Sequence, residues 1–176
     1  MMSLWRSRYS GRLWLAILVL GLNGAPQKTK EEKVPGDPVP QPIAYSHKTH
    51  LAQGLKCATC HTMPDEGFVA TYPKETTCMG CHTTVKPESA EIQKLAAYAA
   101  KKEPVPWVRV YRLPDIVWFN HALHVKVAKT ECAVCHGEVE KRDVLFQEKS
   151  IAMASCMSCH AKHSAPNGCD VCHAVH

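Results

Sequence analysis

Residues 119–136 read FNHALHVKVAKTECAVCH and combine two patterns that recur along this chain. The first pattern is an aromatic residue followed by two histidines, in the order aromatic-x-His-x-x-His. The second is Cys-x-x-Cys-His, here Cys132 to His136. Residues 45–61, YSHKTHLAQGLKCATCH, carry the same two patterns in the same order. The chain therefore contains a repeated unit, and this unit decides which kind of fold it can adopt.

Cys-x-x-Cys-His occurs five times and uses all ten cysteines of the 176-residue chain. We number the copies in chain order as motifs 1 to 5: Cys57–His61, Cys78–His82, Cys132–His136, Cys156–His160 and Cys169–His173. This pattern is the attachment signature of c-type haem. Two thiols must reach two vinyl groups of one porphyrin, and the next residue must offer an imidazole to the iron. A disulfide framework or a zinc site would not require a histidine after every cysteine pair.

The sequence thus predicts five covalently attached haems c. Their thioether bonds are expected from Cys57, Cys60, Cys78, Cys81, Cys132, Cys135, Cys156, Cys159, Cys169 and Cys172. Their proximal iron ligands are expected to be His61, His82, His136, His160 and His173.

The six remaining histidines are also candidates for iron ligands: His47, His50, His121, His124, His163 and His176. Four of them form two matching pairs, one before motif 1 and one before motif 3. Two histidines at i and i+3 lie on one side of a helical turn, so each can point at a different iron. Irons with two imidazole ligands have no vacant position for a substrate. The pattern therefore favours electron transfer and argues against an enzyme.

The spacing of the repeats supports this interpretation. His47 and His121 are 74 positions apart, Cys57 and Cys132 are 75 apart, and Cys78 and Cys156 are 78 apart. Each unit contributes two histidines and two motifs. A short tail, from His163 to His176, adds motif 5.

Over residues 43–176 the pattern resembles the class III multihaem cytochromes c, especially the trihaem type. In that family the first histidine of each pair ligates the haem of the following motif, and the second ligates the next haem. The resemblance implies these distal ligands: His47 for motif 1, His50 for motif 2, His121 for motif 3 and His124 for motif 4. For motif 5 it leaves His163 as the best candidate and His176 as the alternative.

The doubled unit is similar to the pentahaem subunit of alternative complex III-type membrane oxidoreductases. This resemblance implies partners of three kinds: iron–sulfur or molybdenum subunits, quinone-site membrane subunits and a periplasmic acceptor. It also implies association with a membrane.

The chain divides by composition into five segments. Residues 1–25 carry three arginines before an apolar stretch at 13–22, which predicts a signal peptide or an N-terminal membrane anchor. We therefore expect export to the periplasm, either free or anchored to the inner membrane. The segments that follow are a Pro-rich linker (26–42), a dihaem unit (43–87), a helical spacer with an extended segment (88–120) and a trihaem unit (121–176).

The composition limits the fold. Aromatic residues make up 7% of the chain, and it has 12 prolines, so side chains alone will not build a generous core. We expect a mostly irregular and α-helical, haem-organised fold, with short helices and loops wrapped around the haems and little or no β-sheet. Residues 88–103 predict an exposed helix. The formal charge of +5 comes without a cluster of basic and aromatic residues, so no nucleic-acid partner is expected.

The function that these patterns predict is electron transfer through a chain of bis-histidine haems. The chain would link a quinol-side or iron–sulfur donor to a periplasmic acceptor, as a subunit of a membrane oxidoreductase complex. One alternative is a free periplasmic electron shuttle. Another is a multihaem reductase that uses one open haem on a small nitrogen or sulfur oxyanion.

Overall fold

The computed structural model describes residues 36–64 and 66–173. The predicted leader (1–25) and most of the predicted linker (26–42) lie outside the described residues, as does His176. The described residues all belong to one compact unit. None of the helices within the described ranges is long and apolar enough to cross a membrane.

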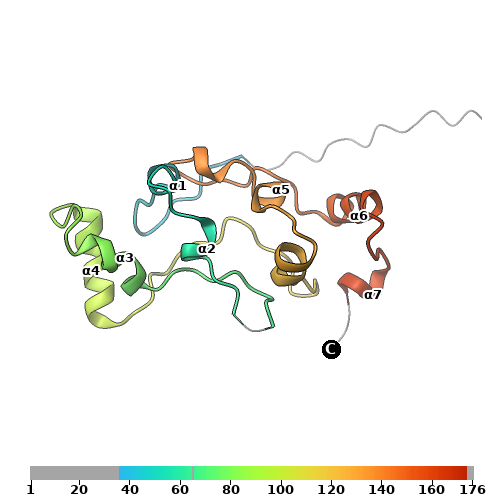
Figure 1. Cartoon of the computed structure of the whole chain (residues 1–176), viewed down its shortest axis with the longest axis horizontal. Helices are drawn as coiled ribbons and strands as arrows, with labels where there is room; N and C mark the ends of the chain where they lie inside the picture. Colours follow the sequence, from blue (N-terminus) through green and yellow to red (C-terminus); the bar gives the residue numbers. More distant parts are fainter. Residues whose placement is uncertain (1–35, 65, 174–176) are drawn as a thin grey trace, which may run out of the picture. The chain divides into compact units, whose positions relative to one another are not determined.

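The described residues contain short helices joined by irregular segments, and no strand occurs among them. This confirms the expected mostly irregular and α-helical fold with little or no β-sheet. The elements are α1 (His47–Leu51), α2 (Cys57–Cys60), α3 (Glu75–His82), α4 (Ala90–Lys101), the π-helix η1 (Leu123–Val127), α5 (Cys132–His136), the 3₁₀-helix η2 (Val139–Lys141), α6 (Met153–Lys162) and α7 (Cys169–Cys172) (Figure 1).

Each Cys-x-x-Cys-His motif is at least partly helical. Helices α2, α5 and α7 begin at the first cysteine of motifs 1, 3 and 5. Motif 2 ends α3, and motif 4 lies inside α6. One helical turn places residues i and i+3 on the same side, so both cysteines of a motif face the same direction. The histidine that follows then lies next to them.

Helix α4 is present where the sequence predicted it, but it is not exposed all round. Leu95 is buried, and with Ile43 and Val105 it forms a small apolar cluster. Ile92 and Tyr98 pack against this cluster from the same face of the helix. The expectation of an exposed helix was therefore wrong for this face. The i, i+3 spacing of Ile92, Leu95 and Tyr98 is the sequence pattern that indicates a buried helix face.

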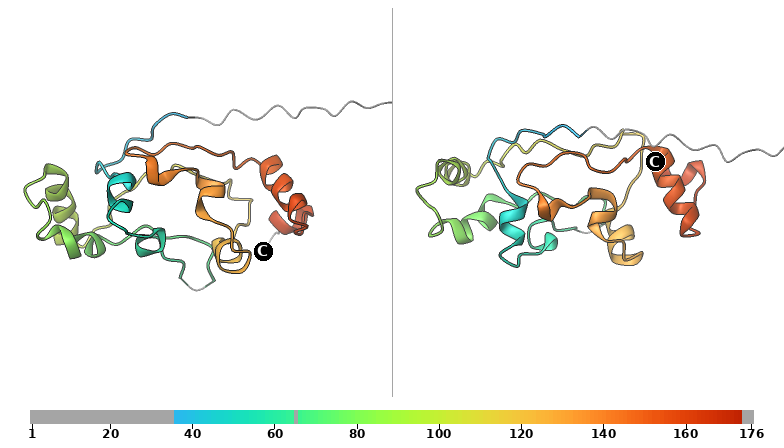
Figure 2. Two further views of the ribbon diagram at one scale, coloured as in Figure 1. Left: turned by 45° about the horizontal axis from the view of Figure 1, so that its top comes forward. Right: turned by 90° about the horizontal axis from the view of Figure 1, so that it is seen from above.

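Residues 103–120 run without regular structure from the end of α4 to the second histidine pair (Figure 2). Gln41 fixes this segment at Val108, whose backbone N–H and C=O each make a 2.9 Å hydrogen bond to the Gln41 side chain. Farther along, the backbone N–H of Trp118 donates to the carbonyl of Cys172 at 2.7 Å. The segment thus connects the N-terminal part of the unit to motif 5.

The two repeats contact each other at α1 and η2. The backbone N–H of Lys48 donates to the carbonyl of Arg142 at 3.0 Å. The Ser46 hydroxyl donates to the Asp143 carboxylate at 2.7 Å, and Lys48 pairs with the same carboxylate. These polar contacts join residues almost a hundred positions apart in the chain.

Candidate haem-binding sites

Both histidine pairs stand on helical turns that begin with the same kind of cap. The Ser46 hydroxyl accepts a 3.0 Å hydrogen bond from the backbone N–H of Thr49. At the equivalent place in the second repeat, the Asn120 side chain accepts one from Leu123, also at 3.0 Å. Such caps satisfy backbone donors that the first turn of a helix leaves free. They fix where each turn starts, and hence where its histidines point.

The aromatic residue of each pair orients both imidazoles. Tyr45 meets the ring of His47 edge-on at 4.8 Å and stacks on that of His50 at 4.3 Å. Phe119 does the same with the two histidines of the second repeat, at 4.8 Å and 4.4 Å. The aromatic residue therefore acts as a wedge between the two imidazoles and separates the directions in which they face.

Three of the four paired histidines, which are the candidates for distal iron ligands, face the histidine of a Cys-x-x-Cys-His motif. The ring centroids of His47 and His61 lie 6.3 Å apart, with the rings parallel to within 6°. The corresponding distance is 6.0 Å for the two further pairs, which are His50 with His82 and His124 with His160. Metal–imidazole bonds of about 2 Å would place two rings on opposite sides of one iron with centroids about 6 Å apart. The spacing of all three pairs fits an axial ligand pair.

Motifs 3 and 5 are less complete. Burial lowers the pKa of His136, and the nearby His121 and then His61 lower it further. For motif 5, the candidate His163 is exposed at the end of α6. Among the described residues, no other histidine ring contacts the ring of His173. The alternative, His176, is outside the described residues.

Most of these imidazoles hold their Nδ1 proton in a hydrogen bond to a backbone carbonyl. A carbonyl only accepts, so Nδ1 must be protonated and Nε2 keeps its lone pair. This second hydrogen bond is the usual way in which proteins orient a histidine that binds a metal. The Nδ1–carbonyl pairs are His50–Ser46, His61–Thr71, His82–Val85, His121–Phe68, His124–Asn120, His160–Pro166 and His173–Ile116, at 2.6 to 3.3 Å.

His47 differs from its counterpart His121. The Nδ1 atom of His47 is buried and has no hydrogen-bond partner among the described residues. Burial lowers the pKa of His47 to about 4, and the nearby His61 and His50 contribute to the shift. His47 is therefore neutral, which is the form that binds a metal.

Large apolar side chains stand exposed beside the motifs. Leu123 and Val127 of η1 are 57% and 71% exposed, and Met153 at the start of α6 is 63% exposed. The flat apolar faces of porphyrins would cover such side chains. The cysteine sulfurs, the imidazoles and these apolar residues together fit covalently bound haem.

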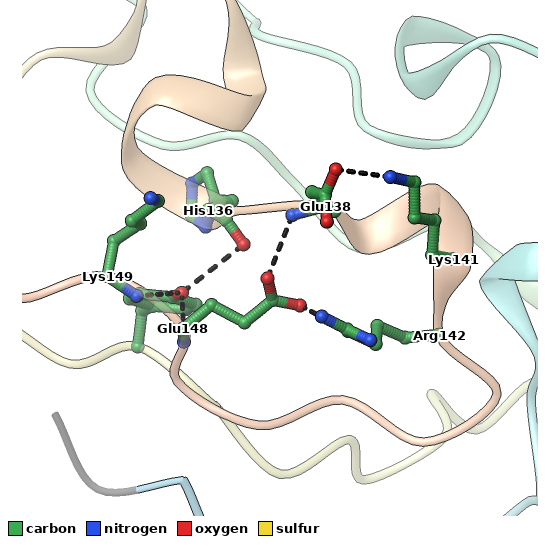
Figure 3. Close-up of polar contacts among 7 residues, drawn as sticks. His136, Glu138, Lys141, Arg142, Glu148 and Lys149 are labelled. Carbon is green, nitrogen blue, oxygen red and sulfur yellow. Dashed lines mark hydrogen bonds and ion pairs between the residues drawn. The ribbon is translucent and has the colours of Figure 1, made fainter.

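A network of polar contacts fixes the end of motif 3 (Figure 3). The Tyr111 hydroxyl donates to the carbonyl of His136 at 3.3 Å and accepts from the backbone N–H groups of Glu148 and Lys149. The Glu148 carboxylate in turn accepts from the backbone N–H of Glu138 at 3.0 Å and from the Arg142 guanidinium at 2.7 Å. Sequence reasoning missed this role of Tyr111, because no local pattern links it to residues 37 positions away.

Short helices that carry Cys-x-x-Cys-His, with histidine pairs at axial-ligand spacing, define a multihaem cytochrome c. Residues 23–104 match the family model described as the class III cytochrome c family. Residues 117–174 match that of cytochrome c7 and related cytochromes c. The chain is 30% identical to the menaquinone reductase multihaem cytochrome c subunit of Nitratidesulfovibrio vulgaris (strain Hildenborough), over 76% of each chain. It belongs to the class III and c7-type multihaem cytochromes c, which bind haem c covalently and carry electrons.

Replacing Tyr111 by Phe tests the network around motif 3. The change keeps the ring, which lies 4.7 Å from that of His136, and removes the hydroxyl. We expect the holoprotein to lose about 1–2 kcal/mol of unfolding free energy, because half-buried backbone groups lose their partner. Denaturant titration measures this loss.

The matched control is Tyr72→Phe, since Tyr72 is 46% exposed and its hydroxyl has no hydrogen-bond partner among the described residues. The control should leave the unfolding midpoint unchanged. Equal midpoints for the two variants would show that the network adds no stability.

Proposed function

We propose that this chain binds five haems c and passes electrons along them, each iron being held by two histidines. The observation that carries the proposal is the 6.0–6.3 Å spacing of three histidine pairs. The proximal ligands are the histidines of the five motifs: His61, His82, His136, His160 and His173. The distal ligands of motifs 1 to 4 are His47, His50, His121 and His124, and motif 5 takes His163 or His176.

Each haem supplies a one-electron centre, and the chain sets its properties. Two imidazoles give a lower reduction potential than the His/Met pair found in other cytochromes c. Hydrogen bonds from Nδ1 to backbone carbonyls hold seven of the rings in place and make those imidazoles stronger donors. Because neighbouring centres interact, the protein should titrate with macroscopic potentials that belong to the set of haems.

The relative's name supports a place in a membrane complex. That protein is a subunit of a menaquinone reductase, and it shares 30% of aligned residues with this chain. We infer that this chain also serves as the haem-bearing subunit of a quinone-linked oxidoreductase in the periplasm. Its partners would include a quinone-site or iron–sulfur subunit and a periplasmic acceptor. Residues 1–25 would direct export or remain as an anchor, with 26–42 as a linker.

Within the chain, residues 43–87 would form a dihaem unit and residues 121–176 a trihaem unit, joined through residues 88–120. The alternative assignment is a free periplasmic shuttle of the same chemistry. A complex subunit and a free shuttle would have the same haem sites. They would differ in the proteins that co-purify with the chain.

Carbon monoxide tests the ligation. The reduced protein should not bind it, because each iron already has six ligands. The imidazole of His124 faces that of His160. Removing this distal ligand by His124→Ala should open one iron, and the variant should bind one carbon monoxide per chain. Optical titration measures the binding.

The control for this variant is Lys126→Ala on the same helix, η1. The Lys126 side chain is exposed and donates a hydrogen bond to the carbonyl of Met63. It should behave like the unmodified protein. Carbon monoxide binding by the unmodified reduced protein would contradict the assignment of two histidines to every iron.

Purification from native membranes in mild detergent tests membership of a complex. Mass spectrometry of the co-migrating proteins should find an integral quinone-site subunit together with an iron–sulfur or molybdenum subunit. Recovery of the chain alone in the soluble periplasmic fraction, without residues 1–25, would instead identify a shuttle.

A further inference from the structure

Contacts of the two histidine pairs show which motifs are neighbours. His47 faces His61 of motif 1, and His50 faces His82 of motif 2, with ring centroids 6.3 Å and 6.0 Å apart. Since Tyr45 contacts both histidines of its pair, motifs 1 and 2 both lie close to this aromatic residue.

The same relation holds further along the chain. Phe119 contacts His121, which is expected to serve motif 3, and His124, which faces His160 of motif 4. Motif 5 follows closely, since α6 with motif 4 ends at Lys162 and α7 begins at Cys169. Motif 4 is therefore a neighbour of both motif 3 and motif 5.

The two repeats meet near motifs 1 and 3. Helix α1, whose His47 faces motif 1, contacts η2, which follows motif 3; the Lys48 N–H donates to the Arg142 carbonyl there at 3.0 Å. Helix α3, which carries motif 2, instead packs against α4. Motif 2 precedes motif 3 in the sequence, yet motif 1 is the spatial neighbour of motif 3.

A loop of the first repeat builds this junction. Residues 66–68 follow motif 1 and lie against the turn that carries His121. The carbonyl of Gly67 accepts from Ala122 at 2.9 Å, and that of Glu66 accepts from the buried Asn120 side chain at 2.6 Å. The carbonyl of Phe68 accepts from Nδ1 of His121 at 2.8 Å. The first repeat therefore orients a histidine expected to serve motif 3.

The arrangement of the helices agrees with these contacts. In both figures α3, which carries motif 2, lies beside α4 at one end of the series of motif-bearing helices. Helix α2 with motif 1 comes next, then α5 with motif 3, and then α6 and α7 with motifs 4 and 5 (Figures 1 and 2).

We propose that electrons cross between the repeats through the haems of motifs 1 and 3, so that the path runs 2–1–3–4–5 and motifs 2 and 5 hold the terminal haems. This proposal rests on the proposed function, because it needs a haem at each motif. It assigns exchange with partners to the α3 and α7 ends. The haem of motif 1, which comes first in the sequence, is then an internal relay.

Nuclear Overhauser contacts between haems in the fully reduced holoprotein test the order. Each haem is assigned through the protons of its own cysteines and histidine. We expect contacts from motif 1 to motifs 2 and 3, from motif 3 to motif 4, and from motif 4 to motif 5. Contacts between motifs 2 and 3, in place of those between motifs 1 and 3, would overturn the proposal.

A variant of the junction tests the crossing point. Gly67 has φ +68°, and a Cβ added there would lie 2.1 Å from the Cβ of Ala122. Gly67→Ala should push the loop off the His121 turn. We expect loss of the contacts between motifs 1 and 3, with those between motifs 1 and 2 and between motifs 3 and 4 retained. Electron exchange between the repeats, seen as line broadening in partly reduced samples, should slow.

The matched control is Gly54→Ala. Gly54 has φ +83°, so alanine meets a similar backbone penalty, but nothing lies within 4 Å of its added Cβ. The control should keep every contact and the exchange rate. If Gly67→Ala also kept both, the loop would not form the crossing point and the proposal would fail.

Intact mass of the same samples separates this proposal from the proposed function. Fewer than five haems per chain would contradict the proposed function. The order would still be judged from the presence of contacts between motifs 1 and 3.

Discussion

Each Cys-x-x-Cys-His segment must present two sulfurs and one imidazole to the same porphyrin, and the rest of the structure follows from this requirement. One helical turn meets it, and the five motifs are accordingly carried by short helices or parts of helices. Between them the chain has little reason to form regular structure. The only hydrophobic side chains buried among the described residues are Ile43, Leu95 and Val105. A core of that size cannot offset the conformational entropy of ordering more than a hundred residues. Haem faces supply the missing apolar surface.

The proposed ligation also requires a histidine on the far side of each iron. For motifs 1 to 4 the chain would meet this requirement by repeating one arrangement, a capped turn with an aromatic residue between two imidazoles. Tyr45 and Phe119 hold their histidines at nearly identical distances and angles. The copies differ at the first histidine. His121 donates its Nδ1 proton to Phe68 of the first repeat, whereas the buried Nδ1 of His47 has no partner among the described residues. The first repeat thus orients the first histidine of the second repeat, and no described residue makes the corresponding hydrogen bond with His47.

The sequence predicted what depends on local spacing. The motifs, the histidine pairs, the helix at 88–103 and the lack of strands could all be read from intervals of a few residues. Features that depend on distant contacts could not. The loop at 66–68 docks on Asn120, 54 positions away, and the Tyr111 hydroxyl joins His136 to Glu148. The spatial order of the motifs differs from their order in the chain for the same reason. Nothing in the spacing indicates that motif 1 lies between motifs 2 and 3.

The central claim is that haem organises this fold. Thermal unfolding of the chain made without haem, followed by circular dichroism beside the holoprotein, tests it most directly. The holoprotein should unfold in a cooperative transition, because its helices share the porphyrin surfaces. The haem-free chain should show a gradual, non-cooperative change with little helical signal to lose. A cooperative transition in the haem-free chain would contradict the claim, since side chains alone would then specify the fold.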